Sequence, residues 1–397
     1  MTFAAFLQKR NFFITAFLFA MACCLLSPLS WVVPRLKKGY QDFAIYYVSG
    51  RLLNEGRKAV LYDLDTQFQE QLTFSDVPIR RGALPFNHPP FEAVLFVPFA
   101  LLTFWPAYLL WTTLNVTMVV ASVALLRRFP PIRDACPWLL GLGVLAFFPL
   151  MNGLLQGQDT ILLMFLGVLA LTCMDRGANV AAGAFLAGGL FRPHIVVPIV
   201  LVLAFRSWRV LLGFSGVALV LAGIGAAVRG WGWPIEYVRF VLLVEHGGSL
   251  QSEVVPNLRG LIMTLVGGFS KTGAGLLLVV SSLAVFVLAT RRVRSGDDSV
   301  SHSFCLASVT GILLSFHALS YDLTLLLPLV LFVLAAAVTK ESQENVKERL
   351  LLVFVLFLAP LYIFLVWAVK LFFIFSLVVL WLFFWLLRMR APAAEPA

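Results

Sequence analysis

The sequence predicts an all-α protein that crosses a membrane many times, and three observations support this fold class. Of the 397 residues, 60% are hydrophobic and 13% are charged, about half the charged fraction of an average soluble protein. Many windows contain the roughly 20 successive apolar residues that a helix needs to span a bilayer. These windows are continuously apolar, whereas the strands of a membrane barrel alternate apolar and polar residues. We therefore expect one integral-membrane domain over residues 1–397.

We count about twelve transmembrane helices in the apolar runs. The sixth run is interrupted by FRPH at 191–194, and the last run holds two spans that divide near Lys370. A short disordered tail is expected at 391–397. The runs cover residues 11–33, 90–103, 107–126, 137–151, 160–174, 179–205, 210–228, 272–290, 301–316, 323–338 and 350–387.

Three polar segments are expected on the extracytoplasmic side. The first loop, 34–90, carries two predicted interfacial helices, one over DFAIYYVSGRLLNEG that ends at Gly56 and one at about 65–74. The second loop covers 229–259, and the third segment is HALSYD at 317–322.

The formal net charge of +10 is interpreted as Lys and Arg beside the membrane, which concentrate on the cytoplasmic side. With the N-terminus inside, twelve spans place Arg127, Arg128 and Arg133 outside, against this rule. Treating 90–126 as one net crossing and 179–205 as re-entrant would place them inside. The two counts also differ in the side on which residues 152–159 lie, and both stay open.

Asp42 is the candidate catalytic residue. It lies about a dozen residues after the first apolar run, near the membrane surface, where it could act as a general base that deprotonates an acceptor hydroxyl. Two structural alternatives are an ion pair with Lys37 or Lys38 and a cap on the following helix, a position that favours Asp.

Charged groups at membrane depth are usually functional or paired, which makes Arg192, His317 and Asp322 candidate substrate-binding residues. Arg192 precedes Pro193 inside an apolar run and could bind a phosphate with its planar guanidinium, or it could snorkel to the membrane surface. His317 could bind a lipid phosphate, or its ring nitrogens could form hydrogen bonds with nearby backbone groups at a helix end. Asp322 could equally cap the following helix.

Two further polar segments supply candidate substrate contacts. Gln158 belongs to NGLLQGQD at 152–159, which could also be a turn capped by Asp159, and Asn87 with His88 precedes two prolines, where a rigid turn is the alternative. No metal or other cofactor is expected. An acidic pair at Asp63 and Asp65 could hold a divalent ion together with His88, but such a pair alone is a weak signal.

Nucleic-acid and nucleotide partners are excluded by the composition and motifs. The sequence has no soluble domain with clustered basic residues, no Walker-A motif and no Rossmann fingerprint. The five cysteines lie in or beside apolar runs without metal-ligand spacing.

Five segments together resemble one family. They are YQDFAIYYVSGRLLNEG after the first span, FNHPPFEAVLFVPFALL at 86–102, the GQD element at 157–159, AGAFLAGGLFRPHIVVPIVL at 182–201 and HALSYDLTLLLP at 317–328. With these motifs the chain resembles glycosyltransferase family 87, of the GT-C superfamily of polytopic glycosyltransferases, over residues 2–328. The chain departs from the family's pattern at Arg192, where Lys is usual, and at Asp159, where Asn is common.

The resemblance implies a GT-C-type membrane enzyme with an extracytoplasmic active site, in the inner membrane of a bacterium. The donor would be a polyprenyl-phosphate sugar, most often mannose, and the acceptor a glycan, lipid or protein, with inversion at the anomeric carbon. Asp42 matches the family's first-loop acid, His317 a late histidine that contacts the lipid phosphate, and Arg192 a basic residue near the same phosphate.

The alternative function is a transporter or flippase of lipid-linked or anionic substrates. Such proteins contain internal repeats and broken helices in matching halves. The break at Arg192 and Pro193 fits this pattern, but the second half of the sequence has no counterpart.

Overall fold

The computed structural model describes residues 3–39, 41–75, 84–246, 252–296, 298–339 and 346–389, which form helices and no strand. This confirms the predicted all-α class; the tail at 391–397 lies outside the described residues. The α-helices are α1 Phe3–Leu26, α2 Leu29–Leu36, α3 Phe43–Asn54, α4 Leu64–Leu72, α5 Pro90–Phe96, α6 Phe104–Leu126, α7 Pro137–Ala146, α8 Phe148–Gln156, α9 Thr160–Asp175, α10 Asn179–Gly188, α11 Pro193–Ala204, α12 Arg209–Arg229, α13 Trp233–His246, α14 Leu258–Leu265, α15 Lys271–Arg294, α16 Val300–Leu314, α17 Leu327–Val338, α18 Val346–Phe357, α19 Ala359–Ile363 and α20 Ser376–Arg388.

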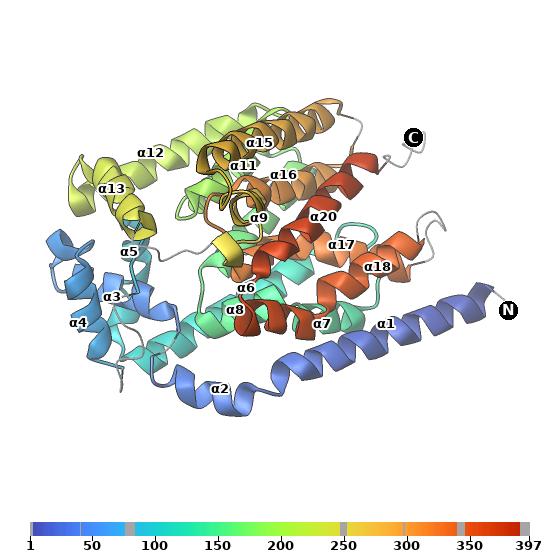
Figure 1. Cartoon of the computed structure of the whole chain (residues 1–397), viewed down its shortest axis with the longest axis horizontal. Helices are drawn as coiled ribbons and strands as arrows, with labels where there is room; N and C mark the ends of the chain where they lie inside the picture. Colours follow the sequence, from blue (N-terminus) through green and yellow to red (C-terminus); the bar gives the residue numbers. More distant parts are fainter. Residues whose placement is uncertain are drawn as a thin grey trace.

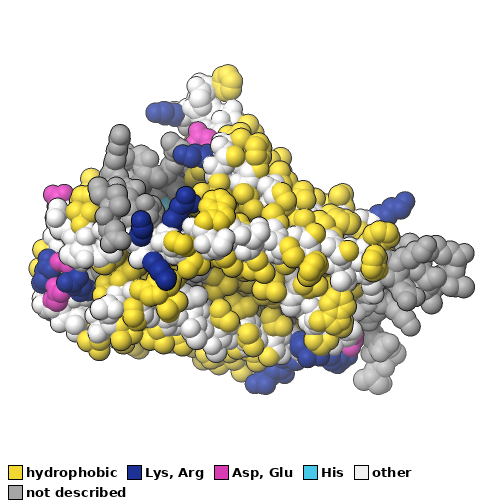
Figure 2. All heavy atoms as spheres, turned by 90° about the horizontal axis from the view of Figure 1, so that it is seen from below, with side chains coloured by type: hydrophobic (Ala, Val, Ile, Leu, Met, Phe, Trp, Pro, Cys, Tyr) yellow, Lys and Arg dark blue, Asp and Glu magenta, His cyan; other side chains and the backbone are white. Residues whose placement is uncertain are grey.

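The long helices run along the long axis of the molecule, as Figure 1 shows. The start of α1 and the end of α20 lie at one end, which we call the terminal end. Helices α3, α4 and α13 lie at the opposite end, which we call the loop end. On the face in Figure 2, hydrophobic side chains cover the middle and charged side chains gather toward the ends and margins. An integral-membrane protein has this distribution, because its middle contacts lipid.

Five helical segments of the described chain are long and apolar enough to cross a membrane, or seven if each of two bent helix pairs is one span. The bent pairs are α7 with α8, at 63°, and α18 with the segment 359–368, at 46°. The expected second span, 90–103, forms no membrane-length helix. It contains α5, whose seven residues cover only about 10 Å, and the short helix η2 (Phe99–Leu101).

Helices α10 and α11 are two short apolar helices separated by the break at 189–192, and neither is long enough to cross a membrane by itself. Arg206, just after α11, donates a hydrogen bond to the backbone of Asp298, between α15 and α16. Arg10 donates to Thr339 O, and the ring of Phe129 contacts Phe332 in α17. Arg127 and Arg128 therefore lie at the same end as Arg10, in agreement with the count that treats 179–205 as re-entrant.

The first loop contains both predicted helices, α3 and α4, and Gly56 follows α3 with a φ of +71°. However, α3 does not lie on the molecular surface as an interfacial helix would. Nine of its twelve residues are buried, because Phe43 and Tyr46 pack against aromatic rings of α5 and α6 and Gly50 lies directly against the backbone of Phe96. The break predicted near Lys370 is confirmed by its φ of +55°.

Close packing of α10 on α12 depends on two glycines. A Cβ atom on Gly213 would collide with Val180 O, and one on Gly183 would collide with Val210 O. We expect Gly213→Ala to lower stability by about 1–3 kcal/mol, since the backbones must separate. Gly216→Ala on the same helix is the control, because its Cβ meets no described atom within 4 Å. Thermal unfolding in detergent measures both, and equal transitions would contradict the prediction.

Candidate functional site

Six of the seven predicted site residues line a cavity of about 360 Å³ at the loop end. They come from the first loop, the residue before α9, the break between α10 and α11, and HALSYD. The cavity is lined by Asp42, Asn87, His88, Gln158, Arg192 and His317. Segments separated by more than 270 positions in the sequence thus meet in one place.

The carboxylate of Asp42 is held by an amide. Gln158 Nε2 donates to Asp42 Oδ2 at 2.8 Å, and the Asp42 N–H donates to Gln156 Oε1 at 3.2 Å. The Asp42 side chain accepts no capping hydrogen bond from the described backbone of α3. The structure therefore does not support the capping alternative, and it places the carboxylate at the cavity.

Gln158 connects Asp42 to Arg192. Its Oε1 accepts hydrogen bonds from Tyr46 Oη at 2.9 Å and from Arg192 Nη2 at 2.8 Å. Because the amide oxygen accepts from these two donors and the nitrogen donates to Asp42, the orientation of the amide is fixed. The turn before it requires glycine: Gly157 has a φ of +63°, and its Cβ would lie 2.8 Å from Phe43 Cβ.

Arg192 is buried and paired with two carboxylates. Its Nη2 lies 2.6 Å from Asp159 Oδ1 and its Nη1 lies 3.0 Å from Asp322 Oδ1. It does not snorkel, since only 4% of the residue is exposed. Asp159 makes no capping bond to the described first turn of α9, so the turn-cap interpretation of this residue is wrong.

Asp322 has the capping role considered for it and also pairs with Arg192. Its Oδ2 accepts from Leu319 N at 2.7 Å, which caps the helix η4 (Ser320–Leu326), while its Oδ1 faces Arg192. It is absent from the described cavity lining, so it acts on the site through Arg192.

His317 faces a second histidine that the sequence analysis did not single out. The rings of His194 and His317 lie 6.0 Å apart, and both line the cavity. His194 Nε2 is buried and has no hydrogen-bond partner among the described residues. The sequence signal that could have identified His194 is its position directly after Arg192 and Pro193, at the break in an apolar run.

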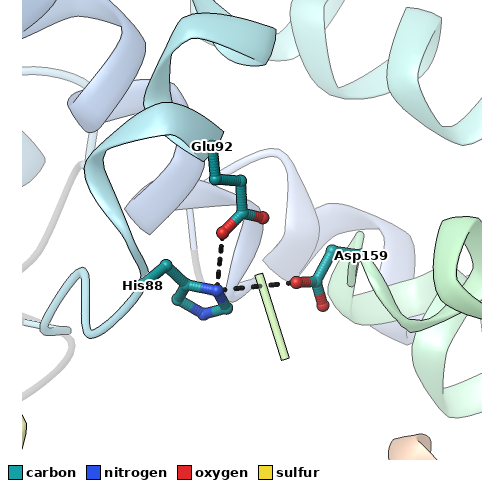
Figure 3. Close-up of side chains that lie close together, drawn as sticks. All are labelled: His88, Glu92 and Asp159. Atoms are coloured by element: carbon teal, nitrogen blue, oxygen red, sulfur yellow. Dashed lines mark ion pairs between the residues drawn. The ribbon is translucent and has the colours of Figure 1, made fainter. Parts of the chain in front are cut away.

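His88, Glu92 and Asp159 form a second group beside the cavity (Figure 3). His88 Nδ1 lies 2.7 Å from Glu92 Oε2 and 3.5 Å from Asp159 Oδ2. Burial lowers the pKa of His88 to about 4, so its imidazole is neutral at pH 7. Glu92 was not predicted; the available sequence signal was an acid four residues after the histidine, in the first turn of the helix that follows it.

The acidic pair of the first loop lies apart from this group. Asp63 Oδ1 accepts from Thr66 N at 2.7 Å and caps α4. Hydrogen bonding from the side chain and then the backbone of Thr66 lowers the pKa of Asp63. Neither Asp63 nor Asp65 belongs to the cluster of His88, Glu92 and Asp159.

Comparison with known proteins identifies the family. The profile of glycosyltransferase family 87 matches residues 86–316, more than half of the chain. The chain belongs to glycosyltransferase family 87. It is also similar to a protein of Mycobacterium tuberculosis named polyprenol-phosphate-mannose-dependent alpha-(1-2)-phosphatidylinositol mannoside mannosyltransferase, with 27% identity over 318 residues, 74% of this chain and 69% of the relative. No solved structure matches the chain.

Membership of glycosyltransferase family 87 confirms the resemblance seen in the motifs. The matched range contains His88, Gln158 and Arg192, while Asp42 and His317 lie outside it and are brought to the same cavity by the fold. The two positions at which this chain departs from the family's pattern, Asp159 and Arg192, are partners of each other.

We expect Asp159→Asn to destabilise the protein by about 3–5 kcal/mol, because it leaves a buried guanidinium with one carboxylate fewer. The control is Asp175→Asn, since Asp175 pairs with Arg128 at 3.6 Å on the surface and such pairs contribute about 0–1 kcal/mol. Denaturant or thermal unfolding in detergent compares the two variants. If Asp159→Asn lowers the stability of the protein no more than the control does, the buried pair does not stabilise the fold.

Proposed function

We propose that this protein transfers a sugar, mannose in the first instance, from a polyprenyl-phosphate donor to an acceptor glycan, lipid or protein, with inversion. The observation that carries the proposal is the cavity in which Asp42 and a pair of histidines meet, in a membrane protein of glycosyltransferase family 87. The name of the mycobacterial relative supports the donor.

The cavity suits attack by a single base. Asp42 is the one acidic residue among the described residues that line it, whereas retaining glycosidases place two carboxylates about 5–5.5 Å apart. Asp42 would take the proton of the acceptor hydroxyl as that oxygen attacks the anomeric carbon. The bond between this carbon and the phosphate oxygen breaks on the opposite side, which inverts the configuration. The leaving phosphate is already an anion and requires no acid.

His317 and His194 would bind the donor phosphate. Both rings line the cavity, and stabilising charge that develops on a leaving group is a major source of catalysis. Arg192 contributes positive charge beside them. Because Gln158 is hydrogen-bonded to both Arg192 and Asp42, Arg192 also helps to fix the position of Asp42. Its described partners Asp159 and Asp322 hold it in place, so we assign it a positioning role as well as an electrostatic one.

A second cavity, of about 170 Å³, is our candidate for the acceptor. It shares Leu319 and Tyr321 with the first cavity, and its lining includes Gln156, Asn152 and Trp367. Gln156 accepts the backbone hydrogen bond of Asp42, so an acceptor bound there would lie near the base. Amide groups together with an indole ring can bind the polar edge and the apolar face of a sugar.

The active site would face the extracytoplasmic side of the bacterial inner membrane. Arg10, Arg128 and Arg206 lie at the terminal end, as do Arg292, which donates to Met389 O, and Arg388. Basic residues mark the cytoplasmic side, so the loop end with the cavity would lie outside. This topology would put the segments 34–90 and 229–259, the latter containing α13, on the extracytoplasmic side of a single domain.

A transporter or flippase of lipid-linked substrates is the second candidate, because α10 and α11 are separated by a break at a buried Arg. A flippase leaves the bond between sugar and phosphate intact. Purified protein in nanodiscs is given radiolabelled polyprenyl-phosphate mannose and a pool of acceptors. Release of polyprenyl phosphate with a labelled product supports the transferase, whereas movement of intact donor without cleavage supports the flippase.

We expect Asp42→Asn to lower kcat by about 10²–10⁴-fold, the contribution typical of a general base, with a small change in KM for the donor. Asp63→Asn is the matched control, because this acid of the same loop caps α4 away from the cavity. Initial rates in the nanodisc assay give both constants. Full activity of Asp42→Asn would exclude Asp42 as the base.

We expect His317→Ala to raise KM for the polyprenyl-phosphate sugar and to lower kcat, because the variant lacks the imidazole that would hydrogen-bond to the phosphate. His302→Ala is the control, because His302 lies at the terminal end and pairs with Asp298. Donor titrations at saturating acceptor separate the two constants. Equal kinetics for the two variants would remove His317 from the phosphate site.

A further inference from the structure

Three side chains of metal-binding type converge behind the cavity. His88 precedes α5, Glu92 lies in the first turn of α5, and Asp159 precedes α9 (Figure 3). One donor atom from each residue lies within 4.8 Å of the other two. Bonds from zinc to nitrogen or carboxylate oxygen are about 2.0–2.2 Å long, so two ligands of one tetrahedral ion lie about 3.3–3.6 Å apart. The 3.5 Å between His88 Nδ1 and Asp159 Oδ2 agrees with this spacing.

Glu92 lacks the hydrogen bonds that a buried carboxylate needs. The residue is 3% exposed, and neither of its oxygens has a hydrogen-bond partner among the described residues. His88 Nδ1, its neighbour at 2.7 Å, is also without a hydrogen bond of ordinary geometry there. An ionised carboxylate in such surroundings is costly unless a cation compensates it.

The charges of the surrounding buried groups point to the same conclusion. Glu92, Asp159 and Asp322 are three buried carboxyl groups, and Arg192 is the buried guanidinium that faces two of them. Three buried carboxyl groups thus share one guanidinium, and the charged or ionisable partner described for Glu92 is the imidazole of His88 at 2.7 Å. A divalent cation bound by Glu92 and Asp159 would supply positive charge to the carboxyl group that Arg192 does not face.

We propose that His88, Glu92 and Asp159 bind one divalent transition-metal ion, such as Mn²⁺ or Zn²⁺. One imidazole and two carboxylates are suitable ligands for these ions, whereas Ca²⁺ takes six to eight oxygen ligands. This site is a departure from the metal-free enzyme that the sequence suggests, and it is separate from the Asp63 and Asp65 pair.

The ion would tune the cavity without being part of its wall. Glu92 and Asp159 are absent from the described lining, whereas His88 and Arg192 belong to it. By neutralising Glu92 and Asp159, the cation leaves the positive charge of Arg192 effective toward an anion in the cavity. It also fixes the start of α5 against the start of α9, and thereby the position of Gln158.

Elemental analysis of the purified full-length protein tests the proposal independently of sugar transfer. The affinity tag is removed, the protein is loaded with Mn²⁺ or Zn²⁺, and unbound metal is washed away. We expect about one ion per chain in the wild type, as for a single closed site, and a clear loss in Glu92→Gln. Asp298→Asn is the matched control, since Asp298 is a buried acid that contacts His302 and Arg292, and it should retain the ion.

Affinity and stability give a second measurement. In a Mn²⁺ titration followed by electron paramagnetic resonance, Glu92→Gln should bind at least about 10–100-fold more weakly, a loss that even outer-shell changes produce. Added Mn²⁺ should raise the unfolding temperature of the wild type and not that of the variant. If Glu92→Gln does not fold, His88→Gln replaces it in both measurements.

Two results would overturn the proposal. One is a wild-type protein that binds neither Mn²⁺ nor Zn²⁺ after loading, as expected if a proton shared by Glu92 and Asp159 compensates the charge. The other is a folded Glu92→Gln protein that keeps the metal content and affinity of the wild type. Either result leaves the proposed sugar transfer untouched, because neither measurement uses donor turnover.

Discussion

The arrangement of the site depends on the buried guanidinium of Arg192. It contacts Asp159 before α9, Asp322 in η4 and Gln158 beside the cavity, so one side chain connects three segments that are distant in the sequence. Each partner also needs Arg192, since a carboxylate buried without a cation is strongly unfavourable. This mutual dependence fixes the loop end of the molecule, and Gln158 passes the constraint on to Asp42.

Close backbone contacts make this arrangement possible. Gly50 lets α3 lie against the backbone at Phe96, and Gly157 makes the left-handed turn that presents Gln158 beside Phe43. Helix α3 is consequently enclosed by protein, and Asp42 at its start is held at the cavity. The polar first loop thus forms one wall of the site, while the apolar helices behind it provide a rigid support.

The location of the cavity accounts for several features of the chain. A lipid-linked donor arrives already activated, which agrees with the missing nucleotide-binding motifs. Its phosphate is a stable leaving group, so one carboxylate and a cluster of positive or hydrogen-bonding groups are sufficient. The two cavities on either side of Leu319 and Tyr321 would keep donor and acceptor apart until both reach Asp42.

Composition and apolar runs by themselves determined the all-α membrane class, because helices that cross lipid must be continuously apolar. Local signals also located α3, α4 and the breaks at Arg192 and Lys370. Motifs, through the family resemblance, selected Asp42, Arg192 and His317. The sequence could not show that Asp159 pairs with Arg192, that His194 faces His317, or that Asp159 joins His88 and Glu92. These contacts join residues up to 123 positions apart. The packing of α5 against α3 and α12, and of η4 against α8 and α9, decides which polar groups meet.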